Sequence, residues 1–129
     1  MTEDTLRGCR VLVVEDEYLL ADELQRELQQ AGAVVIGPVG RLAAALQLAR
    51  SEAVIDLALL DVNLGGETVF PAADHLAARG IPIVFTTGYD ASSIPAGYAN
   101  VATCEKPYAI SSIIGTLGSL MAQRKDPPA

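Results

Sequence analysis

The chain has few of the residues that build disulfide frameworks or zinc sites. It contains two cysteines, Cys9 and Cys104, and one histidine, His75, in 129 residues. Two widely separated cysteines make neither a disulfide framework nor a zinc site, so we expect two reduced thiols. His75 has no cysteine or second histidine near it and is expected on the surface of a helix.

Positive charge is also scarce. Lysine and arginine together number 9 against 16 acidic residues, which gives a formal net charge of −7. Binding of nucleic acid requires clustered lysine and arginine, so we expect no nucleic-acid partner. No apolar run approaches the roughly 20 residues of a membrane span, and residues 1–8 lack the apolar core of a signal peptide. We therefore expect a cytoplasmic protein with no membrane partner.

What is present favours one globular domain. Half of the residues (50%) are hydrophobic and 19% are charged, which is not the composition of a disordered chain. The length suits a single domain with its own core. We expect that domain to span residues 1–129, with a core from about residue 9 to residue 124 and short flexible termini.

Strand-like and helix-like segments alternate along the chain. Apolar runs predict strands at residues 10–14, 34–36, 57–60, 82–85 and 101–104. Apolar residues at helical spacing predict helices at 17–31, 41–51, 68–79 and 110–123, with a short or irregular fifth helix within 90–100. This alternation predicts an α/β fold: a flavodoxin-like, doubly wound sheet of five parallel strands and five helices, in the common order 2-1-3-4-5. In that order Cys9 and Cys104 are too far apart to form a disulfide.

Polar side chains follow four of the predicted strands, at the point where each strand ends. They are Glu15 and Asp16 after the first strand, Asp61 after the third, Thr87 after the fourth and Lys106 after the fifth. Because the carboxyl ends of parallel strands meet at one edge of the sheet, we expect these groups to lie together. Glu17 is expected to be an acid at a helix N-terminus, favoured by the helix dipole.

Three carboxylates at one place repel each other unless a cation binds between them. The atoms that these side chains offer to a cation are all oxygens. Mg²⁺ typically uses one or two carboxylates, several waters and a phosphate. The cluster therefore predicts a magnesium–phosphate site. Lys106 would bind one phosphate oxygen and the hydroxyl of Thr87 another. Asp61, the central carboxylate, could attack phosphorus and form an acyl phosphate.

These residues resemble the response regulator receiver domain, the phosphoacceptor module of two-component signalling. The resemblance covers about residues 10–124 and is carried by the segments 11–17 (Val-Leu-Val-Val-Glu-Asp-Glu), 59–63 (Leu-Leu-Asp-Val-Asn), 82–88 (Pro-Ile-Val-Phe-Thr-Thr-Gly) and 106–107 (Lys-Pro). It implies that Asp61 is the phosphoacceptor, that Asp16 binds Mg²⁺ (or Mn²⁺) directly, and that Glu15 binds it through water.

The same resemblance assigns three further residues and the partners. It implies that Asn63 binds the metal through its backbone carbonyl, and that Thr87 and Lys106 are the switch hydroxyl and the phosphate-binding lysine. A histidine kinase or histidine phosphotransfer protein would phosphorylate Asp61 and shift a two-state equilibrium at the face of the fourth helix, fifth strand and fifth helix. No enzyme activity is implied beyond self-phosphorylation and self-dephosphorylation.

No effector domain follows the receiver pattern, so we expect output by protein contact or by action as a phosphate sink. Residues 85–89 (Phe-Thr-Thr-Gly-Tyr) resemble the motif of the "FATGUY" receivers, which are often single-domain regulators. The wide apolar stripe of the last predicted helix leaves a homodimer open.

Two positions depart from the common receiver pattern. Many receivers have an aromatic switch residue three positions before the lysine, where this chain has Thr103. Many also have a proline four residues after the phosphoacceptor, where this chain has Gly65, and we expect the Gly65-Gly66 loop to be mobile. We hypothesise that Tyr89, Tyr108 or a loop rearrangement carries the switch instead.

Three other functions are alternatives to the receiver. An aspartyl-phosphate hydrolase needs an acid where this chain has Asn63, and it needs a cap domain. A flavodoxin-like nucleotide binder needs a phosphate-binding loop after the first strand, where the acids 15–17 would repel phosphate. A pseudo-receiver would act as an adaptor without phosphorylation, although all the chemical groups for phosphorylation are present.

Overall fold

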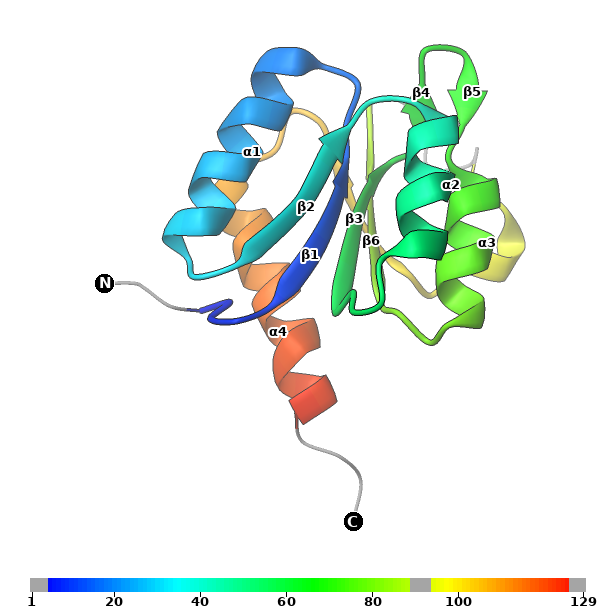
Figure 1. Ribbon diagram of the computed structural model, residues 1–129. Coiled ribbons are helices and arrows are strands. Elements are labelled where there is room, and N and C mark those ends of the chain that lie inside the picture. Colours follow the sequence, from blue (N-terminus) through cyan, green and yellow to red (C-terminus); the bar gives the residue numbers. More distant parts are fainter. Residues whose placement is uncertain (1–4, 89–93, 126–129) are drawn as a thin grey trace.

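The computed structural model describes residues 5–88 and 94–125 (Figure 1). Five parallel strands form one sheet in the order β2-β1-β3-β6-β7. These strands are β1 (Arg10–Val14), β2 (Val34–Val39), β3 (Leu57–Asp61), β6 (Ile83–Thr87) and β7 (Ala102–Glu105). Counted along the chain, this is the predicted order 2-1-3-4-5, which is confirmed.

Helices cover both faces of the sheet (Figure 1). They are α1 (Tyr18–Gln30), α2 (Leu42–Ser51), α3 (Phe70–Ala78) and α4 (Ile110–Lys125). Alternate side chains of the central strands point to opposite faces. One set packs with α1 and α4, and the other set packs with α2 and α3. Both faces are buried, which explains why β1 and β3 are nearly continuous apolar runs.

The described residues hold four α-helices rather than five, and in place of the short or irregular fifth helix expected within 90–100 there is a 3₁₀-helix. The stretch 90–100 holds only the 3₁₀-helix η2 (Ala96–Tyr98) in its described part. Pro95 precedes this turn and Gly97 lies inside it. Proline lacks a backbone N–H and glycine has a low helix propensity, so a longer α-helix is not favoured there.

A β-hairpin that the sequence did not predict follows β3. It pairs β4 (Asn63–Leu64) with β5 (Glu67–Thr68) in antiparallel fashion. The two turn residues, Gly65 and Gly66, have φ values of 63° and 98°. A tight hairpin turn with positive φ at both central residues strongly favours glycine. The expected mobile loop is therefore a closed turn, and its mobility stays a prediction.

The core begins earlier than residue 9. Leu6 is fully buried against α1 and α4, and its N–H donates to the carbonyl of Ala31 at 2.8 Å. Gly32 permits this approach, because a Cβ there would lie 2.8 Å from the Cα of Arg7 and its φ is +97°. The first described residues are thus held onto the end of α1.

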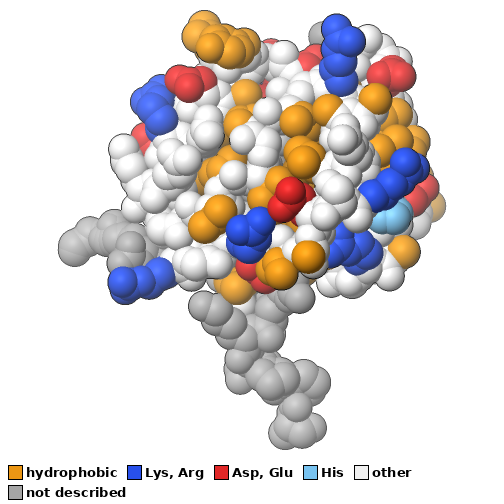
Figure 2. All heavy atoms as spheres, in the orientation of Figure 1, with side chains coloured by type: hydrophobic (Ala, Val, Ile, Leu, Met, Phe, Trp, Pro, Cys, Tyr) orange, Lys and Arg blue, Asp and Glu red, His pale blue; other side chains and the backbone are white. Residues whose placement is uncertain are grey.

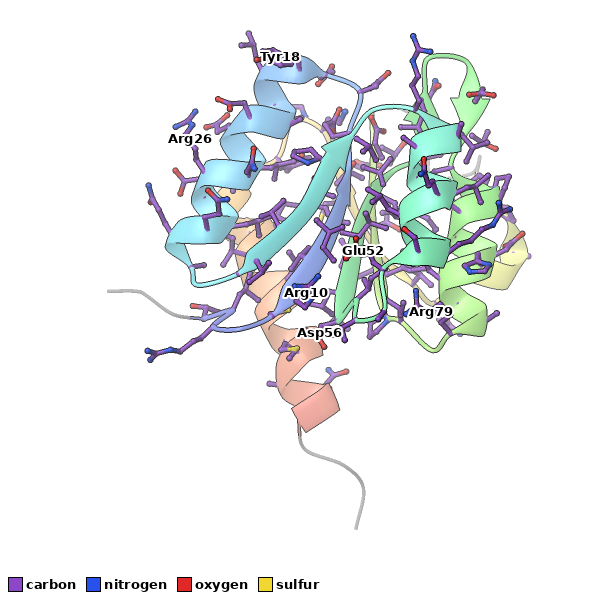
Figure 3. The ribbon with its side chains drawn as sticks, in the orientation of Figure 1. Arg10, Tyr18, Arg26, Glu52, Asp56 and Arg79 are labelled. Atoms are coloured by element: carbon purple, nitrogen blue, oxygen red, sulfur yellow. The ribbon has the colours of Figure 1, made fainter. Side chains whose placement is uncertain are left out.

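Polar contacts close the end of the sheet opposite the polar strand ends (Figure 3). The guanidinium of Arg10 donates to Glu52 at 3.1 Å, and its backbone N–H donates to Asp56 at 2.9 Å. Arg79 donates to the carbonyls of Ala49 and Ala53, at 2.7 and 3.0 Å. Because the last carbonyls of a helix lack partners within it, Arg79 stabilises the end of α2.

Two negative predictions can be compared with the structure. Cys9 precedes β1 and Cys104 lies on β7, with β3 and β6 between them, and the two thiols are not joined in a disulfide. The prediction for this pair is confirmed. None of the described helices is long and apolar enough to cross a membrane.

Candidate functional site

The carboxyl ends of the parallel strands surround a cleft of about 870 Å³. Asp61 at the end of β3, Thr87 at the end of β6 and Lys106 after β7 all line it, together with Asp16 after β1. Asn63 and the glycine turn of the hairpin form another side. The parallel topology therefore brings together residues that are far apart in the sequence, as the strand pattern predicted.

Lys106 is the centre of the charge network. Its ammonium lies 3.2 Å from Oδ2 of Asp61 and 3.2 Å from Oε2 of Glu15. A third carboxylate, Glu17 Oε1, lies at 3.5 Å. The backbone N–H of Lys106 donates to the carbonyl of Thr87 at 2.8 Å, which attaches the lysine to the end of β6.

The two carboxylates nearest to the lysine are buried. Asp61 and Glu15 are each 3% exposed. Burial raises the pKa of Asp61 to about 7, with the charge of Glu15 as the second cause, and the ammonium of Lys106 only partly offsets this rise. Burial lowers the pKa of Lys106, but the charges of Asp61 and Glu15 outweigh it, so the net pKa is raised and the lysine stays charged.

Backbone N–H groups hold both buried carboxylates in place. The N–H of Glu17 donates to Oε2 of Glu15 at 3.0 Å, and the N–H of Asn63 donates to Oδ1 of Asp61 at 3.3 Å. The side chain of Asn63 in turn accepts from the N–H of Gly66 at 3.1 Å. The hairpin and the phosphoacceptor candidate are thus linked through one residue.

Three carboxylates meet the requirements of a cation site. Glu15, Asp16 and Asp61 each offer an oxygen, and these oxygens lie within 4.8 Å of one another. Asp16 is exposed while the other two are buried, so the cluster opens to solvent on one side. Oxygen-only donors beside water suit a hard cation such as Mg²⁺ or Mn²⁺. The donor set therefore fits the predicted metal.

Thr86, Thr87 and Thr103 lie in different environments. Thr87 is 4% exposed and lines the cleft, whereas Thr86 pairs in the sheet between Asp61 and Cys104. Thr103 pairs with Phe85, and its hydroxyl donates to the carbonyl of Val101. Tyr89, one of the hypothesised switch residues, lies outside the described residues.

Two side chains of this site were not assigned to it from the sequence. Glu17 precedes α1 without capping it, and its carboxylate faces Lys106 instead. Tyr108 lines the cleft two residues after Lys106. The run of three acids at 15–17 was the available signal for Glu17. Tyr108 had been named from the sequence only as a candidate switch residue, because Thr103 lacks an aromatic ring.

The family model of the response regulator receiver domain matches residues 11–111. The chain belongs to this family. The resemblance drawn from the strand-end residues is thus confirmed for the receiver domain as a whole.

Curated and solved relatives agree with the assignment. The transcriptional regulatory protein PdtaR of Mycobacterium tuberculosis is 30% identical over 109 residues, which are 81% of this chain and 53% of PdtaR. This chain therefore spans about half the length of that relative. SdrG from Sphingomonas melonis is 35% identical in its solution structure, with a TM-score of 0.76 over 93% of this receiver and 99% of SdrG.

A third similar structure comes from a family of streptococcal redox sensors described as evolved from two-component response regulators. It is 27% identical, with a TM-score of 0.80 over 92% of this receiver and 53% of that chain. Receivers of this fold are regulatory modules, and their family interacts with histidine kinases or phosphotransfer proteins and with downstream effectors.

Proposed function

We propose that the protein is a phosphoacceptor receiver of a two-component phosphorelay, acting in the cytoplasm. Asp61 accepts the phosphoryl group from a histidine kinase or a histidine phosphotransfer protein. The observation that supports this most directly is the contact of buried Asp61 with Lys106 at 3.2 Å, in an open cleft with a carboxylate cluster that fits a cation.

The cation is held by this chain's own oxygens. Asp16, Asp61 and the backbone carbonyl of Asn63 would hold Mg²⁺, and Glu15 would reach it through water. Bound Mg²⁺ supplies positive charge that favours the ionised form of Asp61 and neutralises charge on the phosphoryl oxygens. This matters because the pKa of Asp61 is about 7 without a cation, and a protonated carboxyl is a poor nucleophile.

Transfer is a single displacement at phosphorus. A carboxylate oxygen of Asp61 attacks phosphorus, and the bond from phosphorus to the donor imidazole nitrogen breaks with its electron pair going to nitrogen. An acyl phosphate on Asp61 is the product. Lys106 leaves its carboxylate partners for a phosphoryl oxygen, and Thr87 donates its hydroxyl to another.

An apolar surface beside the cleft suits a protein donor. Tyr18 and Leu19 at the start of α1 are 82% and 80% exposed. Tyr18 points away from the body of the molecule (Figure 3), and apolar side chains project at this end of α1 in the space-filling view (Figure 2). Exposed apolar side chains next to a reacting group are typical of a docking site. We propose that the phosphodonor protein contacts them.

Readout of the phosphoryl group differs from the common receiver pattern, because Thr103 supplies no aromatic ring. We propose that phosphorylation shifts Thr87, at the end of β6, and Tyr108, in the connection after β7, and thereby changes a protein-binding face. Output by protein contact and output by draining phosphate from a relay are both consistent with this step.

The decisive experiment is incubation with acetyl phosphate and Mg²⁺, followed by intact-mass measurement. The wild type should gain one phosphoryl group, and Asp61→Asn should gain none. Asp22→Asn, an exposed aspartate on α1, is the matched control and should be labelled like the wild type. Absence of label on the wild type, or equal label on Asp61→Asn, would overturn the proposal.

The alternative is an adaptor that binds partners without phosphorylation. The similarity to a structure from the redox-sensor family shows that relatives of receivers can have other activities. The intact set of carboxylates, hydroxyl and lysine favours phosphorylation here. Failure of the labelling experiment would favour the adaptor.

A further inference from the structure

Tyr108 combines two environments in one side chain. It lies in the connection from β7 to α4, where its ring packs against the apolar cluster under α1 and α4. The same residue lines the cleft that holds Asp61 and Lys106. Its hydroxyl oxygen is buried, and within the described part of the chain it has no hydrogen-bond partner.

An unpartnered buried hydroxyl is uncommon in folded proteins and costs free energy. A phenylalanine at this position would keep the ring packing without that cost. The oxygen of Tyr108 therefore destabilises the unphosphorylated protein relative to the ring alone. The unpartnered hydroxyl is explained if a bound ligand supplies its hydrogen-bond acceptor.

The surroundings of the hydroxyl indicate the chemistry of that ligand. Burial raises the pKa of Tyr108, and the charges of Glu15, Asp61 and Glu17 raise it further. The phenol therefore remains protonated at neutral pH and keeps a hydrogen that it can donate to an acceptor. In the unphosphorylated protein the ammonium of Lys106 already forms ion pairs with the carboxylates of Glu15 and Asp61, at 3.2 Å from each.

We propose that the hydroxyl of Tyr108 donates a hydrogen bond to an oxygen of the phosphoryl group on Asp61. This inference rests on the proposed function and adds a phosphoryl-binding residue to it. Lys106 and Thr87 line the cleft at the ends of β7 and β6, and Tyr108 lines it from the connection after β7. Each phosphoryl oxygen can accept more than one hydrogen bond, so the three donors are compatible.

Tyr108→Phe tests the inference, because it removes one oxygen and keeps the ring. The probe is beryllium trifluoride with Mg²⁺, which mimics a phosphoryl group on aspartate. Titration calorimetry should show an affinity for this probe about 5-fold weaker than that of the wild type, the size expected for one hydrogen bond. The melting temperature of Tyr108→Phe without the probe should be equal to or higher than that of the wild type.

Asp22→Asn is the control, since Asp22 is exposed on α1 and does not line the cleft, and this variant should bind the probe like the wild type. Equal affinity of Tyr108→Phe and wild type would overturn the inference and leave the proposed function intact. A lower melting temperature of Tyr108→Phe without the probe would also overturn it, because the hydroxyl would then have a partner in the resting protein. Failure of the wild type itself to bind the probe would overturn the proposed function.

Discussion

The phenol of Tyr98 donates a hydrogen bond to the carboxylate of Asp74, which ties η2 to α3. The ring of Tyr98 also stacks on Phe70, with centroids 5.9 Å apart, and meets Phe85 edge-on at 5.2 Å. Phe85 is the sheet neighbour of Thr103 and lies two residues before Thr87. A cluster of rings from other elements thus packs around the strand position beside Thr103.

Tyr98→Phe should lower the free energy of unfolding by roughly 0.5–1.5 kcal/mol, because the hydrogen bond is lost while the ring contacts remain. Urea denaturation measures this change. Asp74→Asn keeps an acceptor oxygen and should cost less. A Tyr98→Phe protein as stable as the wild type would show that the contact with Asp74 contributes nothing net.

Asp61→Asn should stabilise the protein near and above neutral pH. The pKa of Asp61 is 3.8 when unperturbed and about 7 in the folded state. Between these values the folded state binds the proton more tightly than the unfolded state, so wild-type stability falls as pH rises. Above the folded pKa the asparagine should add roughly 2–4 kcal/mol.

Urea denaturation of both proteins across pH, without divalent cations, tests this linkage. The two proteins should converge below about pH 4, where the aspartate is protonated in both states. Asp22→Asn should follow the wild type throughout. If Asp61→Asn were less stable than the wild type above neutral pH, the ion pair with Lys106 would outweigh burial and repulsion.

Mg²⁺ should raise the melting temperature, because it binds the folded carboxylate cluster and not the unfolded chain. The gain is about 2.7 kcal/mol at a concentration 100 times the dissociation constant. Asp16→Ala should lose most of this rise, since Asp16 is the exposed member of the cluster. Glu23→Ala, on α1 outside the cluster, should keep the rise. An unchanged response in Asp16→Ala would remove Asp16 from the metal site.

Leu6→Ala should cost about 2–4 kcal/mol, the usual range for a leucine truncated in a core. Leu6 is fully buried although it precedes the first strand. Thermal or urea denaturation measures the loss, with Leu19→Ala as the exposed control, for which about 0.5 kcal/mol or less is expected. A small loss in Leu6→Ala would show that residues 5–8 detach without consequence for the sheet.

Leu19→Ala and Tyr18→Ala should slow phosphotransfer from a purified histidine kinase or phosphotransfer protein that labels the wild type. Labelling by acetyl phosphate should continue at the wild-type rate, because the small donor needs no docking surface. Equal rates with the protein donor would place its contact elsewhere on the receiver.

Much of the site could be predicted because its geometry follows from the sheet. Asp61 comes directly after an apolar run, and Lys106 follows another with only Glu105 between. Parallel strands bring their carboxyl ends to one edge. The alternation of strands and helices predicted a doubly wound sheet, and the strand order was expected because it is common in such sheets. Pro95 and Gly97 indicated a short or irregular helix within residues 90–100, and the described part of this stretch holds a 3₁₀-helix in place of a fifth α-helix.

The sequence by itself determined which chemical groups meet, because the spacing of apolar residues and the ends of the apolar runs are local patterns. Only the tertiary structure decided how they are paired. Lys106 contacts a glutamate 91 positions away and an aspartate 45 positions away, and Leu6 enters the core through contacts with two helices. That the oxygen of Tyr108 has no partner among residues 5–88 and 94–125 could be recognised only from the positions of their donors and acceptors in space. Such contacts depend on distances between residues remote in the chain, and no local pattern encodes them.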